Sequence, residues 1–351
     1  MQWLDLVALG TVCDVVPLVG LNRALVAQGL KVMARRDNIG IRALSDVASV
    51  DEGPTTYHAG FILGPRVNAG GRVGEAGLGA RLLTTANEDE AREMALRLDA
   101  WNKERRELET VCLEEAVDQV ERDGMDDGLV YASAENWHAG VIGIVASRLK
   151  ERYNRPACVV AWEGGVGKGS GRSITGVDLG SAVIAARQSD LLVNGGGHPM
   201  AAGFSVSEDN ELAFRKFLAD HIERQVGPGG VVRSLMIDAA VQPAGATAEL
   251  ALDLARIAPF GAGNPEPRFV LPAARVAKAD VVGENHVRCF LTGETGGRLK
   301  AISFRSLGEP HGDAILNSNG MPLHIAGHIR VDRWQGREEA QLIIEDVAAV
   351  Q

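Results

Sequence analysis

The sequence predicts an α/β protein in which a helical N-terminal segment, a long connecting helix and an α/β domain are followed by a small β-barrel. Three patterns support this prediction. Apolar residues recur at helical spacing through residues 87–123, strand-like and helix-like segments alternate between residues 128 and 187, and five short strand-like stretches follow residue 230. The chain has 351 residues, 46% apolar and 23% charged, which is typical of a globular protein of two or three domains.

Cysteine usage and hydropathy exclude several classes of protein. The four cysteines, at positions 13, 112, 158 and 289, form no CxxC pair, so neither a zinc ribbon nor a disulfide scaffold is indicated. No secretory leader is visible, and no apolar run approaches the roughly 20 residues that a membrane span needs. We therefore expect a cytoplasmic protein without a membrane partner.

The charge is unevenly distributed along the chain. The net charge of −10 argues at first sight against a polyanionic partner. However, residues 87–123 alone hold 13 acidic and 6 basic side chains, so most of the negative charge lies in one segment. Because a nucleic-acid groove depends on its local basic groups, nucleic-acid binding elsewhere on the chain is compatible with this composition.

The first half of the chain is predicted to be helical. Residues 4–19 are apolar around Asp5 and Asp14, and residues 21–36 and 39–50 have helical patterns. In the long helix, Asn87 and Glu90 form a possible capping box, and Gly124 supplies the stop. At 1.5 Å per residue this helix would span about 55 Å, which suits a rod that connects domains. An acidic surface helix on a single domain is the alternative.

The second half of the chain alternates strands and helices before it becomes strand-rich. Strands are expected at residues 128–133 and 157–162 around a helix at 139–153, with another helix at 178–187. A Gly-Pro-Gly-Gly sequence at 227–230 then marks a boundary. Strand-like stretches at 235–241, 287–291, 299–304, 323–331 and 340–347, with one helix at 247–257, predict an OB-like barrel.

Three segments combine cationic or polar side chains with glycine, as phosphate sites do. Residues 64–72 carry Arg66, Asn68 and Arg72, whose two guanidinium groups can fork onto phosphate oxygens. His138 precedes the helix at 139–153, where free N–H groups favour an anion. Residues 167–173 present the polar side chains Ser170, Arg172 and Ser173 between glycines, without the order of an ATPase P-loop. The structural alternatives are a tight turn whose arginines cap helices, a capping histidine and a polar hairpin.

A fourth segment, residues 194–203, contains the three consecutive glycines Gly195, Gly196 and Gly197 followed by His198. Each glycine costs roughly 1 kcal/mol relative to alanine in regular structure, which suggests that a ligand approaches the backbone here. His198 would then lie next to a nest of backbone N–H groups, where it could bind a phosphate or transfer a proton.

Two further features bear on function. Asp14 lies in an apolar stretch where an unpaired carboxylate would be costly, so it either caps a helix or binds a hard divalent cation. On residues 323–334, His324, His328, Arg330 and Trp334 share one face opposite apolar positions. Arg330 and Trp334 could follow phosphates and stack bases, so replacing both by alanine should weaken single-strand binding. Rim residues of a solvated strand are the alternative.

In order, six segments of the chain closely resemble RecJ, the family of single-strand-specific exonucleases in the DHH phosphoesterase superfamily. They are LDLVALGTVCDVVPL at 4–18, GPRVNAGGR at 64–72, NWHAGVIGIVASRL at 136–149, GSGRS at 169–173, NGGGHPMAAGFS at 194–205 and PFGAGNPEPRF at 259–269. The resemblance implies the C-terminal part of a DHH catalytic domain at 1–86, a connecting helix at 87–123, a DHH-associated domain at 124–227 and an OB-fold domain at 228–351.

The resemblance also implies an activity and roles for the site residues. It implies 5′ to 3′ hydrolysis of single-stranded DNA in repair and recombination, at a centre of two Mn²⁺ or Mg²⁺ ions. Asp14 would be a catalytic metal ligand, and His198 would face the scissile phosphate. Ser170 and Arg172 match phosphate-contacting positions, and further site positions are matched by Arg66, Asn68, Arg72 and His138. A single-strand-binding protein and a helicase are candidate partners.

One departure from the family pattern concerns the metal ligands. The sequence contains no consecutive His-His, and only thirteen residues precede Asp14. The metal site is therefore incomplete, and we expect the C-terminal part of a RecJ-like protein that binds single-stranded DNA weakly and does not cleave it alone. The alternatives are a DHH phosphodiesterase for small substrates and a non-catalytic module that binds single-stranded DNA.

Overall fold

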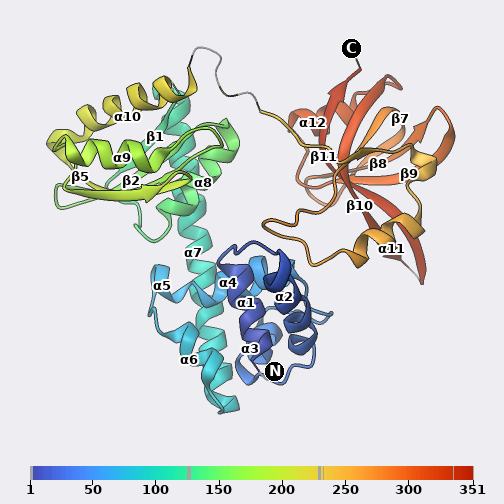
Figure 1. Cartoon of the computed structure of the whole chain (residues 1–351), viewed down its shortest axis with the longest axis horizontal. Helices are drawn as coiled ribbons and strands as arrows, with labels where there is room; N and C mark the ends of the chain where they lie inside the picture. Colours follow the sequence, from blue (N-terminus) through green and yellow to red (C-terminus); the bar gives the residue numbers. More distant parts are fainter. Residues whose placement is uncertain (1–2, 125–127, 228–230, 232, 335, 351) are drawn as a thin grey trace. The chain divides into compact units, whose positions relative to one another are not determined.

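The structure is a computed structural model that describes residues 3–124, 128–227, 231, 233–334 and 336–350. It divides into two compact units, one formed by residues 1–32 with 234–351 and the other by residues 33–233. Each unit has its own apolar core, and most of the longer elements are labelled in Figure 1. The described helices include none long and apolar enough to cross a bilayer.

The first unit begins with two packed helices. α1 (Leu4–Cys13) and α2 (Gly20–Met33) bury Ala8 and Val26 together with Leu18 from the connecting turn. The helices approach closely at Gly29, where a Cβ would lie 2.1 Å from the carbonyl oxygen of Leu4. The predicted helix at 21–36 is therefore confirmed but ends three residues early.

The rest of the first unit is the predicted OB-like barrel. Its strands are β7 (Phe269–Val282), β8 (His286–Gly293), β9 (Gly296–Ser303), β10 (Pro322–Trp334) and β11 (Arg337–Ala349). The order β10-β11-β9-β8-β7 is closed by antiparallel pairing of β10 with β7. Three helical segments, η3 (Pro243–Gly245), α11 (Ala248–Arg256) and α12 (Pro310–Leu316), accompany the strands. Closure leaves the barrel with no long free edge.

Two details of the barrel differ from the sequence prediction. The strand expected at 235–241 is reduced to β6 (Ala239–Ala240), which pairs with β7. The longest part of the sheet, β7, was not predicted. Its sequence contains Pro272, its register shifts between Val276 and Lys278, and Ala273 has a positive φ of 49°. These irregularities break the simple alternation by which a strand is recognised.

The second unit begins with a helical layer. After α3 (Ile39–Val47), a π-helical turn η1 (His58–Leu63) leads into the short helices α4 (Gly64–Val67), α5 (Gly70–Val73) and α6 (Leu78–Thr84). All of them pack near α7 (Glu88–Asp123) or its neighbours, and α7 continues without a break to the sheet of the same unit (Figure 1). The predicted long helix is confirmed.

The capping of α7 differs in detail from a capping box. The side chain of Asn87 accepts hydrogen bonds from the N–H groups of Asp89 and Glu90, as expected. The return bond is indirect, because the N–H of Asn87 donates to Thr85 Oγ1 at 3.2 Å and the Thr85 hydroxyl donates to Glu90 at 3.1 Å. Gly124 ends the helix with a φ of 81°.

The sheet of the second unit has five strands in the order β1-β2-β3-β5-β4. They are β1 (Val130–Ala134), β2 (Ala157–Glu163), β3 (Val166–Arg172), β4 (Asn194–His198) and β5 (Ala201–Ser207). One face is covered by α9 (Leu179–Gln188) and α10 (Glu211–Val226), which follows the 3-10 turn η2 (Glu208–Asn210). The other face is covered at β1 and β2 by α8 (Ile142–Tyr153) and the end of α7.

The two glycine-rich segments expected to bind phosphate are strands. Residues 167–173 lie almost wholly in the central strand β3, and Gly195, Gly196 and Gly197 lie in the edge strand β4. The alternative of a polar hairpin fits residues 167–173, because β3 forms an antiparallel hairpin with β2. The nest of backbone N–H groups expected at residues 195–197 is wrong, because these residues are extended and pair with β5. The predicted domain boundaries at 86, 123 and 227 are a separate matter and stay predictions.

Candidate phosphate-binding site

One face of the second unit's sheet gathers polar residues from three neighbouring strands. Arg172 of β3 is paired with Ala201 of β5, which is paired in turn with His198 of β4. Ser170 lies two residues before Arg172 on β3, so its side chain points to the same face. The order of the strands therefore brings Ser170, Arg172 and His198 together from segments that are separated in the sequence.

The floor between these side chains is bare backbone. Gly203 of β5 and Gly196 of β4 lie beside Ser170 in register, and a Cβ on either glycine would meet nothing within 4 Å. This part of the face is therefore open. Because glycine has no side chain, a ligand can approach the backbone of the strands more closely at these positions than at any other residue type.

The other two glycines of the Gly-Gly-Gly sequence face the opposite side. A Cβ on Gly195 would lie 2.9 Å from a methyl carbon of Val183 in α9, and one on Gly197 would lie 2.4 Å from the carbonyl oxygen of Ala201. Packing therefore explains Gly195 and Gly197, and only Gly196 belongs to the open floor.

The first turn of α8 forms a wall beside β3. A Cβ on Gly143 would lie 3.0 Å from both Arg172 Nη2 and Ser170 Oγ, so glycine is needed for this close approach. Arg172 Nη1 donates to Ser170 Oγ at 3.1 Å and to the carbonyl of Gly171 at 2.9 Å. The N-cap residue Val141 offers no side-chain cap, which leaves the electropositive helix terminus available to an anion.

Arg72 reaches this wall from α5. Its Nη1 donates to the carbonyl of Gly140 at 3.1 Å, just before α8. Burial lowers the pKa of Arg72, and the positive charge of Arg172 lowers it further, although Glu109 acts in the opposite direction. Two guanidinium groups close enough to perturb each other would both be stabilised by a shared anion.

Arg105 of α7 is a third arginine in this neighbourhood, and sequence reasoning missed it. Its side chain is 10% exposed, it contacts Glu109 at 2.6 Å and Asn102 at 3.2 Å, and its buried Nε has no partner among the described residues. Burial lowers its pKa, and the charge of Arg72 contributes to the same effect. Charged residues on a long acidic helix resemble a solvated surface, so no sequence pattern distinguishes Arg105 from the other arginines of α7.

His138 lies in the turn before α8 rather than at the helix terminus. The helix begins at Ile142, three residues later than predicted. Nδ1 of His138 accepts a hydrogen bond from the N–H of Gly140 at 3.0 Å, and the ring is exposed. It therefore stabilises the turn that Arg72 also contacts.

Three of the expected site residues have other environments. Arg66 is mostly buried and binds Asp99 Oδ1 at 2.9 Å and the carbonyl of Ile62 at 2.8 Å, so its guanidinium joins α4 to α7. Ser173 is buried and donates to the carbonyl of Val177 at 2.7 Å, away from the open floor. Asn68 is exposed at the end of α4.

Asp14 belongs to the first unit, where it is the C-terminal cap of α1 and is exposed. The expectation that it is buried among apolar residues is wrong, because the neighbouring helix buries Ala8 and Leu9 instead. Within the described residues there is no group of three or more His, Cys, Asp and Glu side chains that could hold a metal ion. Asp14 by itself does not make an Mn²⁺ or Mg²⁺ site.

The expected basic and aromatic face of the barrel is only partly available to a ligand. The apolar positions of β10 point into the barrel as predicted. However, Arg330 on the outside forms a bidentate ion pair with Glu266 at 2.8 and 2.5 Å, and His328 contacts Glu345 at 3.3 Å. The backbone of Trp334 ends β10, and its side chain lies outside what the structure describes.

A second aromatic and basic group lies on the outside of the barrel at β7, β8 and β9. Phe290 of β8 is paired with Lys278 of β7 and with Lys300 of β9. The guanidinium carbon of Arg298 lies 4.0 Å from the centroid of the Phe290 ring. Lys300 is paired with Asp332 at 2.5 Å and Lys278 with Asp280 at 3.1 Å, so this group offers a ligand mainly the Phe290 ring and the guanidinium of Arg298.

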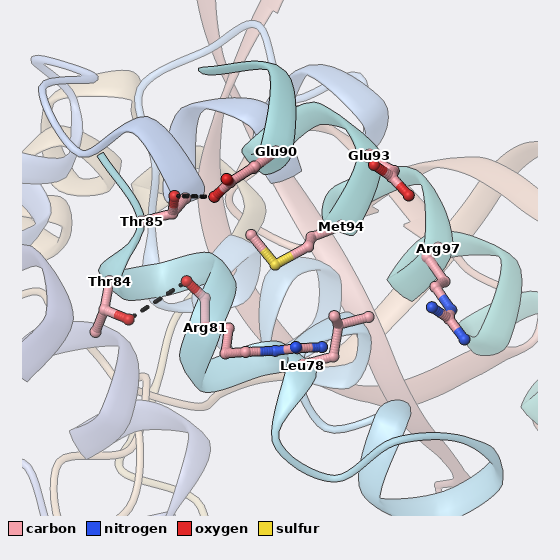
Figure 2. A pocket seen from close by; sticks show the side chains of 8 residues that line it. All are labelled: Leu78, Arg81, Thr84, Thr85, Glu90, Glu93, Met94 and Arg97. Atoms are coloured by element: carbon pink, nitrogen blue, oxygen red, sulfur yellow. Dashed lines mark hydrogen bonds between the residues drawn. The ribbon is translucent and has the colours of Figure 1, made fainter. Parts of the chain in front are cut away.

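A separate hollow lies between α6 and α7 of the second unit, and Figure 2 shows the side chains that line it. Cations and carboxylates alternate there, since Arg81 and Arg97 are accompanied by Glu90 and Glu93. Arg81 is also paired with Glu75 at 2.9 Å. This balance of charge makes the hollow unsuitable for a phosphate.

Family models match two regions of the chain, the sheet domain of the second unit and the barrel of the first. Residues 126–224 match the DHHA1 domain, and residues 237–346 match the RecJ OB domain. The chain therefore combines a DHHA1 domain with a RecJ OB domain.

The chain is also similar to RecJ proteins over nearly its whole length. It is 36% identical to the single-stranded-DNA-specific exonuclease RecJ of Escherichia coli over 99% of this chain and 61% of the relative. It is 32% identical to RecJ of Bacillus subtilis over 99% of this chain and 44% of the relative. The crystal structure of Thermus thermophilus RecJ in complex with Mg²⁺ matches with a TM-score of 0.86 and 31% identity, covering 100% of this chain and 52% of that chain. The chain thus spans about half to three fifths of the length of these relatives.

Proposed function

We propose that this chain binds single-stranded DNA as the substrate-holding part of a RecJ-type 5′ to 3′ exonuclease acting in DNA repair and recombination. One observation carries the proposal. Arg72, Ser170 and Arg172 converge beside a floor of exposed glycine backbone. The names of the relatives, single-stranded-DNA-specific exonucleases, supply the substrate class.

The geometry suits a phosphodiester group. Gly196 and Gly203 admit a phosphate to the backbone, while the guanidinium of Arg172 and the hydroxyl of Ser170 can donate to its oxygens. The same donors would stabilise the negative charge that develops during hydrolysis. His198, exposed on the same face, is placed to hold or donate a proton at the rim.

Mn²⁺ or Mg²⁺ is the cofactor expected for the whole enzyme, because Thermus thermophilus RecJ has been crystallised with each of these ions. The residues present here do not complete a site for such an ion. Asp14 is one candidate ligand, and the sequence holds no consecutive His-His. We therefore propose that the chain alone binds DNA without cleaving it.

The barrel would offer the DNA strand a second contact surface. Phe290 can stack a base while Arg298 contacts a phosphate, which requires no particular sequence. A surface of this kind favours a long strand over the short oligonucleotides used by small-substrate DHH phosphodiesterases. A cytoplasmic location and cooperation with a single-strand-binding protein or a helicase are part of the same proposal.

Fluorescence anisotropy with a labelled single-stranded oligonucleotide tests the proposal. Arg172→Ala should weaken binding about tenfold to a hundredfold, as expected for loss of hydrogen bonds from a charged donor. Arg122→Ala is the matched control, because Arg122 is exposed at the far end of α7 and pairs only with Asp123 in the described contacts. Equal binding of duplex and single strand, or of Arg172→Ala and the unchanged chain, would refute the proposal. Mn²⁺-dependent cleavage by the chain alone would refute its non-catalytic part.

A further inference from the structure

The segment Pro259–Arg268 between α11 and β7 contacts two different parts of the first unit, and the phosphate site does not use it. It contains most of the Pro-Phe-Gly-Ala-Gly-Asn-Pro-Glu-Pro-Arg-Phe motif of residues 259–269. We name it the bridging segment. Its contacts run toward the turn after α1 on one side and toward the barrel strands on the other.

On the first side, the bridging segment packs on residues 17–19. The N–H of Leu18 donates to the carbonyl of Ala262 at 2.6 Å. A Cβ on Gly261 would lie 2.8 Å from a methyl carbon of Leu18, and one on Gly263 would lie 3.1 Å from the Cβ of Pro17. Leu18 is itself buried between α1 and α2, so this contact reaches the turn that contains Asp14.

The turn that makes this contact is internally fixed. Gly261 and Asn264 exchange two backbone hydrogen bonds of 2.9 and 3.1 Å. The side-chain amide of Asn264 donates to the carbonyl of Pro259 at 2.8 Å. Gly263 has a φ of 71°, which a residue with a side chain rarely adopts. These hydrogen bonds and the conformation of Gly263 make the turn rigid.

On the second side, the bridging segment is held to the outside of the barrel. Arg330 of β10 donates two hydrogen bonds, of 2.8 and 2.5 Å, to the carboxylate of Glu266. Nδ1 of His328 lies 3.0 Å from the carbonyl oxygen of Pro267. The next residue, Arg268, forms a bidentate pair with Glu345 of β11 at 2.6 and 2.8 Å.

We propose that Arg330 is a positioning residue, which acts through Glu266 to hold the bridging segment against Leu18 and so fixes the turn after Asp14 relative to the barrel. The ion pair with Glu266 uses the Nε and Nη2 donors of the guanidinium, which is one of the two edges that could bind a DNA phosphate bidentately. The proposal rests on the proposed function only for the catalytic importance of Asp14. The mechanical link itself is a property of the folded chain.

Charge reversal of the ion pair tests the link. Glu266→Arg and Arg330→Glu should each remove the attraction, and the double variant should restore it with the partners exchanged. Hydrogen exchange of the peptide that contains Leu18, measured without DNA, reports the distant contact. We expect each single variant to speed exchange of the Leu18 amide about tenfold or more, and the double variant to return it to within about twofold of the unchanged chain.

The alternative, that Arg330 contacts DNA directly, gives the opposite pattern. Arg330→Glu would then weaken single-strand binding whatever residue stands at 266, and Glu266→Arg would leave Leu18 protected. That pattern, or a folded double variant that fails to restore protection, would overturn the proposal. Circular dichroism of each variant establishes folding, and Glu266→Gln, which keeps the shape of the side chain, replaces Glu266→Arg if the reversal prevents folding. If the unchanged chain failed to bind DNA, the proposed function would fail while the exchange result would stand.

Discussion

Gly143 of α8 lies against Arg172 of β3 so closely that a Cβ on the glycine would stand 3.0 Å from Nη2 of the arginine. Gly143→Ala should therefore displace the guanidinium and weaken single-strand binding about tenfold, although alanine favours the helix by roughly 1 kcal/mol. Anisotropy and thermal unfolding together measure both effects. Gly10→Ala in α1 is the control, because a Cβ there meets nothing within 4 Å and binding should not change.

The open glycine floor makes a second prediction. Gly203→Val adds a side chain where nothing lies within 4 Å, so it should obstruct the phosphate without lowering the melting temperature. Gly169→Ala on β3 is the contrasting variant, because its Cβ would stand 2.0 Å from the ring of Phe204 and should cost about 1–3 kcal/mol of stability. Unimpaired binding by Gly203→Val would show that the floor is not used.

The Arg66–Asp99 pair should matter for stability rather than for DNA. The two side chains are 11% and 8% exposed, so removing one leaves a buried charge with fewer partners. Arg66→Ala should lower the free energy of unfolding by about 3 kcal/mol, measured by urea titration. The fraction that remains folded should bind single-stranded DNA normally. A large loss of affinity in folded Arg66→Ala would instead favour the phosphate-contact role predicted from its motif.

Asp99 also predicts a dependence of stability on pH. Burial alone would raise the pKa of Asp99, but hydrogen bonds from Lys103 and Arg66 outweigh it, so the pKa lies below its ordinary value. The stabilisation is therefore fully present above the pKa of an unfolded aspartate, about 3.9, and is lost as the pH falls through the lower folded value. Asp99→Asn should be less stable at neutral pH and should show a shallower loss in acid. Parallel curves for the two proteins would contradict this.

The barrel surface around Phe290 gives a prediction for longer DNA. Phe290→Ala should weaken binding of a long oligonucleotide by about 1–3 kcal/mol, the usual value of one stacked base. Arg298→Ala should reduce the dependence of affinity on salt, because it removes a cation 4.0 Å from that ring. Arg256→Ala is the control, since Arg256 is exposed on α11 and paired with Asp253. Identical salt dependence for the Arg298 and Arg256 variants would exclude this path.

The sequence predicted the elements whose periodicity is regular. The helix at 88–123 repeats apolar residues for many turns, and the odd positions of β10 from Leu323 to Val331 are apolar or glycine. Both elements follow from these patterns, although β10 carries a register shift at Ala326 and Gly327. The glycine-rich strands β3 and β4 are not predicted as strands, because glycine is rare in strands and contributes no side-chain pattern. Their strand conformation depends on neighbours in the sheet, which a local pattern does not reveal.

Only part of the site was predicted, because its assembly also depends on the tertiary structure. Ser170, Arg172 and His198 were identified from motifs, and strand pairing brings them to one face. The sequence did not distinguish Arg72, which faces this site, from Arg66, which stands six residues earlier and binds Asp99. Such neighbours differ only in the direction in which a short helix projects them, and tertiary packing sets that direction.

The shared helix α7 has a consequence for how the second unit unfolds. Ala91, Ala95 and Leu98 are buried near its beginning, where α3 and α6 pack, whereas Cys112, Ala116 and Val120 are buried near its end against β1 and α8. Both halves of the second unit therefore depend on α7, because its beginning completes the apolar core of one half and its end completes that of the other. A single proteolytic cut near the middle of α7 would leave two fragments, neither of which could bury its apolar core alone. The second unit should therefore unfold in one cooperative step.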